Sequence, residues 1–454
     1  MRALIAAAFF AFALPALAQE RPPVTVFVDV NVVPMVTDQV RRRQTVIVRD
    51  GKIEAIAPRL AAPAGARVID GRGTAWLSPG LVDGHVHSDT AQDMKIYLAN
   101  GITTVFNMGE ASNGFVGQIR PLLNSGARPG PHVYVAFVVD GGPRYGHFTI
   151  TTPDEARAVV GLAKTNGYDF IKVYNNLSAE CFAALIEAGK AQGVPIVGHG
   201  IIAVGVPAQL AAGQRLIAHM EEFLYTGFSA PGAPPPEGIP PDSAIPAVVA
   251  ATKASGGFVG ADLVTYGAIA RQWGRPQVVE GFMRRPEIAT LYPGDRISWR
   301  RQGYAGRTGD ISPQLAFLGR LTKAMSVAGV PLISGTDAPT IPGVFPGGSL
   351  HDNLDALQAA GLSPFATLAT ATRTPGELIA RDQPAAMRFG TITPGARADL
   401  ILTAANPLES LPTLRSPLGV MAAGRWYDAA ELQGLRSEVA AEYDRAGASP
   451  PPAP

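Results

Sequence analysis

The stretch Leu81-Val82-Asp83-Gly84-His85-Val86-His87 decides how this chain is expected to fold. It is short and largely apolar, and a Ser-Pro-Gly turn precedes it, so we expect a β-strand that is buried on both faces. Side chains alternate between the two faces of a strand, so His85 and His87 point the same way. Two imidazoles can then meet at one point. By itself, such a pair fits two hydrogen-bonded core histidines as well as it fits a metal site.

Seven further apolar runs follow, and helical patterns alternate with them. We expect eight strands in all, over residues 81–87, 103–108, 132–137, 170–174, 195–199, 216–220, 257–262 and 331–337. Helices are predicted between them, for example over 153–165, with Thr152 as the N-cap, and over 178–191. The fold class is therefore α/β. Eight parallel strands close a (β/α)8 TIM barrel, in which active residues lie at the C-terminal strand ends.

Shorter strands of another kind flank this region. Residues 24–33, 44–48, 52–57 and 67–70 alternate apolar and polar side chains between Gly and Asp turns, and a matching pattern returns at 390–392, 398–402 and 419–427. We predict a small composite β-sandwich domain from residues 19–80 with 386–436, around a barrel of residues 81–385. Residues 437–454 end in Ala and Pro and are predicted to form a loosely held tail.

The first 18 residues have the pattern of a cleaved secretory signal peptide. Arg2 supplies a positive charge, an apolar run follows from Ala3 to Leu14, and an Ala-x-Ala site ends at Ala18. The run is shorter than the ~20 residues of a membrane-spanning helix. We therefore expect cleavage after Ala18 and a mature protein that is periplasmic or secreted, without a membrane anchor.

Composition gives little support for a macromolecular partner. The 454 residues include 38 basic and 37 acidic side chains, and 47% of them are hydrophobic. This near-neutral balance argues against nucleic acid or an anionic membrane and leaves a small-molecule substrate as the expected partner. Whether the chain forms a homo-oligomer stays open. The single cysteine, Cys181, excludes an internal disulfide and is expected to pack as a small apolar residue.

Side chains that can bind a metal recur at the ends of the predicted strands. His85 and His87 end the first strand, Lys172 lies in the fourth, His199 ends the fifth, His219 lies in the sixth and Asp337 ends the eighth. Four of the seven histidines thus fall at one rim of the predicted barrel, which scattered core histidines would not do. Imidazole and carboxylate groups are suitable ligands for a divalent metal such as zinc.

This set of residues resembles the amidohydrolase superfamily, and within it the exported members related to imidazolonepropionase-like proteins, Xaa-Pro dipeptidases and metal carboxypeptidases. The residues that carry the resemblance are His85-x-His87, Phe170-Ile171-Lys172-Val173-Tyr174, Gly198-His199-Gly200, Ala218-His219-Met220 and Ser334-Gly335-Thr336-Asp337-Ala338. The resemblance extends over nearly the whole mature chain, to residues 393–400. Each motif is weak alone, but the combination is specific.

The resemblance implies two divalent metal ions, with zinc as the expected metal. One ion would be held by His85, His87 and Asp337, and the other by His199 and His219, with a carboxylated Lys172 bridging both. An unmodified lysine is a cation, and placing it beside two metal ions would be repulsive. A carbamate on its nitrogen reverses the charge and offers two oxygens. The alternatives are that Lys172 points outward or that the site holds one metal.

Loop residues around this rim are candidates for substrate binding. Arg144, Tyr145 and His147 lie in a Gly-rich loop after the third strand, and Tyr174 shares a strand face with Lys172. Each of them could equally be a packed loop residue.

Other parts of the chain are less specific. The insertion 263–310 is rich in arginine, and a guanidinium from it could bind a substrate carboxylate, although most arginines in such runs are solvated. The Pro- and Gly-rich loop 229–246 is expected to be an ordered cover. His132 and His351 are expected to be structural.

The leading hypothesis is an exported binuclear metal-dependent amidohydrolase that cleaves a C–N bond with a metal-activated water, for which Asp337 would be the general base and then the general acid. A dipeptide or N-acyl amino acid is the expected substrate class. A cyclic amide, lactone or ester hydrolase with the same metals is the first alternative. A deaminase fits less well, because the superfamily's mononuclear deaminases lack the strand-four lysine and carry a Glu shortly after the fifth-strand histidine. A non-catalytic binding barrel is the alternative from another class.

Overall fold

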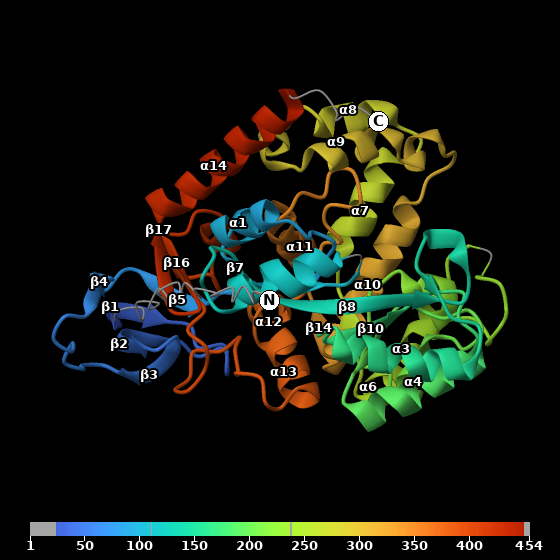
Figure 1. The fold of residues 1–454 in the computed structure, drawn as a ribbon, viewed down its shortest axis with the longest axis horizontal. Coiled ribbons are helices and arrows are strands. Elements are labelled where there is room, and N and C mark those ends of the chain that lie inside the picture. Colours follow the sequence, from blue (N-terminus) through green and yellow to red (C-terminus); the bar gives the residue numbers. More distant parts are fainter. Residues whose placement is uncertain (1–23, 110, 237, 449–454) are drawn as a thin grey trace, which may run out of the picture.

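The computed structural model describes residues 24–109, 111–236 and 238–448 (Figure 1). The predicted signal peptide therefore lies outside the described residues, and export stays a prediction. Within the described ranges, no helix has both the length and the apolar character that are needed to cross a bilayer.

Eight parallel strands form a barrel in the middle of the chain. They are β6 (Leu81–Val86), β7 (Ile102–Asn107), β8 (His132–Asp140), β10 (Phe170–Val173), β11 (Ile196–Gly198), β12 (Leu216–Ile217), β13 (Phe258–Gly260) and β14 (Leu332–Ile333), paired in chain order from β6 to β14. The barrel closes between its first and last strands, because the Gly84 N–H donates to the carbonyl of Ser334 at 2.8 Å and the Asp337 N–H donates to the carbonyl of His85 at 2.8 Å. The predicted (β/α)8 barrel is confirmed. Several strands end earlier than predicted, because their last residues belong to the loops that carry the site.

Apolar side chains from all eight strands fill the barrel interior beneath its C-terminal rim. This cluster includes Val82, Phe106, Tyr134, Phe170, Val197, Leu216, Phe258 and Ile333. Because side chains alternate along a strand, Lys172 shares the inward face of Phe170, and His199 shares that of Val197. The pairing of β6 shifts register between Asp83 and Val86, and this irregularity turns the histidines of the first strand inward as well.

Helices surround the barrel and cover its outer face (Figure 1). They are α1 (Ala91–Ala99), α2 (Arg120–Asn124), α3 (Pro153–Thr165), α4 (Ala179–Gln192), α5 (Val206–Ala212), α6 (Ile245–Ser255), α10 (Ser312–Ala328), α11 (Gly348–Ala359), α12 (Pro364–Thr370) and α13 (Arg373–Asp382). The predicted cap of α3 is present as a capping box, in which Thr152 accepts from the N–H of Glu155 and the Glu155 side chain accepts from the N–H of Thr152. Cys181 is fully buried among the apolar residues of α4, as expected.

A second sheet combines the two ends of the chain, as predicted. Its strands are β1 (Thr25–Val32), β2 (Arg41–Arg49), β3 (Lys52–Ala57), β4 (Arg67–Asp70), β5 (Trp76–Pro79), β15 (Leu400–Thr403), β16 (Gly419–Ala422) and β17 (Arg425–Asp428). β1 and β17 are four strands apart in this sheet, which is roughly 19 Å if the sheet were flat. The rings of Phe27 and Trp426 nevertheless lie 5.3 Å apart, so the sheet folds over on itself around a core of its own.

Two details of the second sheet differ from the prediction. Residues 419–427 are not one strand but the hairpin β16–β17, whose turn residues Ala423 and Gly424 have φ angles of 50° and 80°. These positive angles suit a tight two-residue hairpin turn. Residues 390–392 form a bend and not a strand, although Ile392 is buried in the core of this sheet.

The prediction of a loose tail from residue 437 is wrong up to residue 448. Those residues continue α14 (Ala429–Ala448), which lies across α1 (Figure 1). Val439 and Tyr443 are one helical turn apart and both pack, buried, against Ile96 of α1. The hydroxyl of Tyr443 donates to Asp93 Oδ1 at 3.0 Å. Burial of this apolar pair and its hydrogen bond hold the helix in place.

The insertion 263–310 folds into a helical layer over the C-terminal rim of the barrel. It contains α7 (Leu263–Gln272), α8 (Pro276–Phe282), η5 (Pro286–Thr290), α9 (Pro293–Arg301) and η6 (Gly303–Gly306). Trp299 is buried in this layer and donates from its indole N–H to the carbonyl of Pro339 at 2.7 Å. The layer is thereby fixed next to the loop that carries Asp337.

Candidate metal centre

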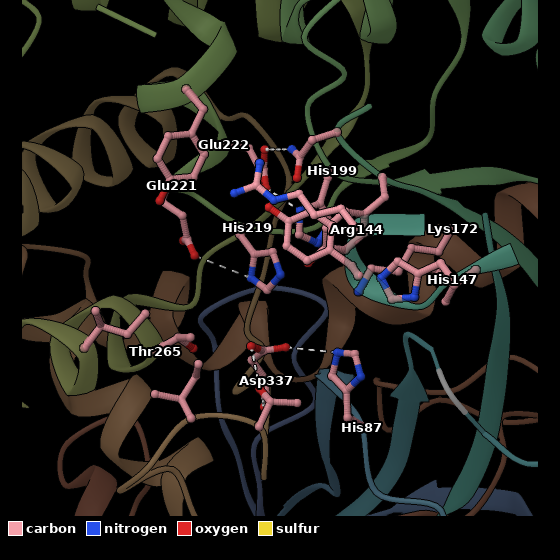
Figure 2. Close-up of a pocket in the computed structure, with 18 of the residues that line it drawn as sticks. His87, Arg144, His147, Lys172, His199, His219, Glu221, Glu222, Thr265 and Asp337 are labelled. Carbon is pink, nitrogen blue, oxygen red and sulfur yellow. Dashed lines mark hydrogen bonds and ion pairs between the residues drawn. The ribbon is translucent and has the colours of Figure 1, made fainter. Parts of the chain in front are cut away.

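Three metal-ligand side chains from opposite ends of the barrel sequence converge on one point. The Nε2 atoms of His85 and His87 lie 3.2 Å apart, and Asp337 Oδ1 lies 3.2 Å from the first and 3.0 Å from the second. Donor atoms on one tetrahedral zinc are roughly 3.3 Å apart, given bond lengths of ~2.0–2.1 Å. The spacing of these atoms therefore fits a shared metal ion. Figure 2 shows Asp337 and His87 facing each other.

The backbone of Asp337 is shaped to present its carboxylate to the histidines. Its φ is 60°, a left-handed conformation that is uncommon for residues other than glycine. The hydroxyl of Thr340 donates to the Asp337 carbonyl at 2.7 Å and to Oδ2 at 2.8 Å. This leaves Oδ1 directed at the two imidazoles.

Lys172 lies beside this group, deep in the barrel. Its Nζ is 3.2 Å from His85 Nε2, and the residue is only 1% exposed. An ammonium group among buried imidazoles is unfavourable, because it both loses its hydration and repels any bound metal. The inward position excludes the alternative in which this lysine points to solvent.

His199 and His219 form the other half of the arrangement. His199 Nδ1 faces Glu222 Oε1 at 2.5 Å, and His219 Nδ1 hydrogen-bonds to Asp262. Metal-binding histidines usually engage a carboxylate with the ring nitrogen that does not bind the metal. Both rings thus leave Nε2 for a ligand on the side away from the carboxylates.

The two halves adjoin each other. The rings of His85 and His219 have centroids 4.2 Å apart, and those of His199 and His219 are 4.9 Å apart. The structure therefore brings all six predicted metal-binding residues to one rim of the barrel.

Electrostatics favour the metal-binding forms of His85, His199 and Asp337, but not that of His219. Burial, together with the charge of Lys172, holds the pKa of His85 and of His199 well below the usual value, so both rings are neutral at pH 7. Burial opposes ionisation of Asp337, but hydrogen bonds with His85 and His87 outweigh it and hold its pKa well below the usual range. For His219, burial is outweighed by the carboxylates of Asp262 and Glu221, which raise the pKa to about 10. Metal binding there would release a proton.

A cavity of about 700 Å³ opens from this centre. The predicted substrate-binding residues Arg144, Tyr145, His147 and Tyr174 all line it. Tyr174 packs its ring on that of His199, with centroids 3.9 Å apart, and the His147 ring lies 4.6 Å from Tyr174. These aromatic rings form one wall of the cavity, and Lys172 Nζ lies 5.9 Å from the centroid of the Tyr174 ring.

The arginine-rich insertion lines the cavity with residues other than its arginines. Among the described residues, its wall includes Gln302 and Tyr304 from the insertion but none of the insertion's arginines. Pro235, from the loop 229–246, also lines it. The arginines of the insertion therefore lie outside this cavity, in agreement with the expectation that most of them are solvated.

Four acidic and aromatic residues of the site were missed by the sequence analysis. Glu221 and Glu222 directly follow the predicted sixth-strand end, and Asp262 ends the predicted seventh strand. Tyr225 lies in the short π-helix η3 (Phe223–Gly227) after β12 and lines the cavity. A carboxylate at a predicted strand end is a signal that could have pointed to Asp262. Glu222 carries no such signal, because its role depends on a contact with His199 that only the fold creates.

Two histidines outside the centre have structural surroundings. His351 is buried in α11 and its Nε2 lies 2.9 Å from the carbonyl oxygen of Asn100. His132 begins β8 at the opposite rim, and its ring packs near Tyr134, with centroids 4.9 Å apart. Both agree with the expected structural roles.

Solved structures share this architecture over most of their length. A bottromycin amidohydrolase matches with a TM-score of 0.73 and 23% identity, over 93% of this chain and 91% of that one. A Xaa-Pro dipeptidase with methionine bound in its active site matches with a TM-score of 0.64 and 21% identity, over 89% of this chain and 100% of that one. The chain has the amidohydrolase fold. The fold that the resemblance implied is thus confirmed.

Sequence relatives match a smaller share of this amidohydrolase-fold chain. A dihydroorotase from Anaeromyxobacter dehalogenans is 26% identical over 185 residues, which are 40% of this chain and 39% of that protein. The chain therefore matches well under half the length of this relative. No protein-family model matches the chain.

Proposed function

We propose that the protein is a metal-dependent hydrolase that cleaves a C–N bond of an amide. The observation that carries this proposal is the convergence of three histidine and aspartate donors at 3.0–3.2 Å at the active rim of the barrel. The amidohydrolase fold and the partial match to a dihydroorotase support the same reaction class.

Two metal ions, with zinc as the expected element, fit the donor set. His85, His87 and Asp337 would hold one ion, and His199 with His219 would hold the other. Lys172, carboxylated on Nζ, would bridge them, which removes the unfavourable buried ammonium group. When bound, the ions would supply an activated water nucleophile and a Lewis acid for the substrate carbonyl.

Asp337 is the residue best placed to move protons. Its low pKa keeps the carboxylate ionised, so it can accept a proton from the attacking water. The same carboxyl group can then pass the proton to the leaving nitrogen. The hydrogen bond from Thr340 holds the group in position during both transfers.

The cavity wall supports a substrate with a carboxylate, such as a dipeptide or N-acyl amino acid. Arg144 lines the cavity, and its guanidinium stacks over Tyr145 with 5.1 Å from Cζ to the ring centroid. A guanidinium held in this way can bind a carboxylate through two parallel hydrogen bonds. His147 and Tyr174 would flank the scissile amide on the same wall.

The test is metal analysis of purified protein followed by a substrate panel. We expect close to two zinc or equivalent ions per chain, and amine release from linear dipeptides or N-acyl amino acids. The similarity to a dihydroorotase favours a second candidate, opening of a cyclic amide. Faster ring opening than linear hydrolysis at equal concentration would select that candidate. Metal-loaded protein that is inert on linear and cyclic amides and on esters would overturn the hydrolase proposal in favour of a binding barrel.

We also propose that residues 1–18 direct export. The charge, apolar run and cleavage site in the sequence support this proposal. The mature protein should begin at Gln19 in a periplasmic or secreted fraction, as measured by N-terminal sequencing. Protein in the periplasmic or secreted fraction that still begins at Met1 would contradict this proposal.

A further inference from the structure

Glu221 is a buried carboxylate that the proposed chemistry does not use. It follows β12, is 9% exposed and lines the cavity. Its Oε1 lies 4.0 Å from His219 Nδ1, and Figure 2 shows the side chain on the opposite side of that ring from His87. Its Oε2 is buried and has no hydrogen-bond partner among the described residues. A carboxylate oxygen in this state is costly unless a ligand provides the missing partner.

Three tyrosines lie near enough to this carboxylate to be influenced by its charge. Tyr225 and Tyr304 line the same cavity, and Tyr266 of α7 is buried beside it. Burial first, and then the charge of Glu221, raises the pKa of Tyr266 to about 12. Burial and the charges of Asp337 and Glu221 likewise raise the pKa of Tyr304 to about 12. A carboxylate with neutral aromatic rings nearby can attract a cation to this part of the cavity.

A purely structural role for Glu221 does not account for these contacts. A structural carboxylate would use its oxygens to bind nearby donors, as Glu222 does with the N–H of Gly200 at 3.0 Å and with Asn175 at 3.2 Å. Nor is Glu221 required by His219, because Asp262 already bonds to that Nδ1.

We propose that Glu221 receives a substrate ammonium group that lies within one or two bonds of the scissile carbonyl. This inference rests on the proposed hydrolase function. Glu221 lies on the Nδ1 side of the His219 ring, 4.0 Å from that nitrogen, so a group bound to it would lie across this one ring from the candidate metal, within reach of the reacting carbon of a short substrate. An α-ammonium group has that relation to the amide carbonyl of a dipeptide, whereas an N-acyl amino acid has no charge there. With Arg144 on the cavity wall, the pocket would bind both charged ends of a short zwitterionic peptide.

The test uses two phosphinic dipeptide analogues that differ only in the presence of the amino group. In the unmodified, metal-loaded protein, isothermal titration should give a Kd at least about 10-fold lower for the amino analogue. In Glu221→Gln this ratio should fall to about 1–2, while the des-amino analogue keeps its Kd within about 2-fold. Glu187→Gln, an exposed glutamate of α4, is the matched control and should leave the ratio unchanged.

The possible results separate this inference from the proposed function. Equal Kd values for the two analogues in the unmodified protein, or an unchanged ratio in Glu221→Gln, would overturn the role of Glu221 and leave the hydrolase proposal standing. Loss of a bound metal from Glu221→Gln would also overturn it, because the residue would then be a metal ligand. If neither analogue binds and no amide is cleaved, the hydrolase proposal itself fails. The comparison in the unmodified protein is decisive even if the variant does not fold.

Discussion

At the residue scale, the centre depends on Asp337 more than on any other side chain. We expect Asp337→Asn to lower kcat/KM by about 10²–10⁴-fold, because the amide keeps the shape but cannot accept a proton from the attacking water. Thr340→Val, which removes the hydroxyl's hydrogen bonds to the Asp337 carbonyl and to Oδ2, should cause a smaller loss. Steady-state kinetics of both variants, at measured metal content, test this. Full activity in Asp337→Asn would exclude it as the base.

The carboxylates behind the second pair of histidines should control metal affinity. Asp262→Asn replaces the charged partner of His219 Nδ1 with a neutral one, so the ring becomes a weaker ligand. We expect metal affinity to fall by about 10–100-fold, measured by competition with a chelator. Asp242→Asn, which removes an exposed carboxylate paired with Arg320, is the control. Equal affinities in both variants would mean that His219 does not bind a metal.

Residues that would bind the metal directly could be predicted from the sequence, but their supporting residues could not. His85, His199 and Asp337 stand at the ends of apolar runs, where the barrel geometry fixes which way a side chain points. Glu222 acts through a contact with another residue, and that contact depends on how the loop after β12 folds. Its sequence neighbourhood contains no periodic pattern that would show this.

At the element scale, the packing of α14 on α1 should make stability depend on pH. Burial raises the pKa of Asp93 to about 7, although hydrogen bonds from Tyr443 and Thr90 oppose the increase. The folded state therefore favours the protonated acid. The stability that Asp93 contributes is fully present below about pH 3.8 and is lost as the pH rises to about 7.

Asp93→Asn should remove this dependence, because the amide cannot ionise. Between pH 4 and 7, the free energy of unfolding of the variant should rise relative to that of the unmodified protein, by on the order of 4 kcal/mol at most. Urea unfolding at pH 4.5 and pH 7.5 measures this, with Asp444→Asn on the exposed face of α14 as the control. If the free energies of unfolding of the unmodified protein and of Asp93→Asn differ by the same amount at both pH values, Asp93 does not titrate in this range.

The elements themselves differ in how well the sequence predicts them. The barrel strands are short runs of apolar residues between turns, so their existence and order follow from the pattern. α14 is rich in alanine and charged residues, and its stability comes from Val439 and Tyr443 packing on a helix more than 300 positions earlier in the chain. Only the folded structure brings those segments together.

At the scale of the whole molecule, the barrel closes where its first and last strands meet, and the candidate centre lies at the same place. His85 and Asp337 belong to segments about 250 residues apart, and the backbone of each also bonds to the other. A metal ion bound between them would connect the two ends of the barrel. Metal binding should therefore stabilise the closed barrel as a unit.

Removal of the metals should lower the melting temperature, and their return should require a source of carbon dioxide. A metal at about 1,000 times its Kd adds about 4 kcal/mol to the folded state, so calorimetry of chelator-treated protein should show a shift of several degrees. If Lys172 becomes a carbamate, zinc with bicarbonate should restore two metals per chain, whereas zinc alone should restore fewer. Lys172→Gln should bind the same amount of metal with and without bicarbonate, because the amide cannot be carboxylated. Bicarbonate-independent loading of two metals by the unmodified protein would show that the lysine binds neither metal as a carbamate.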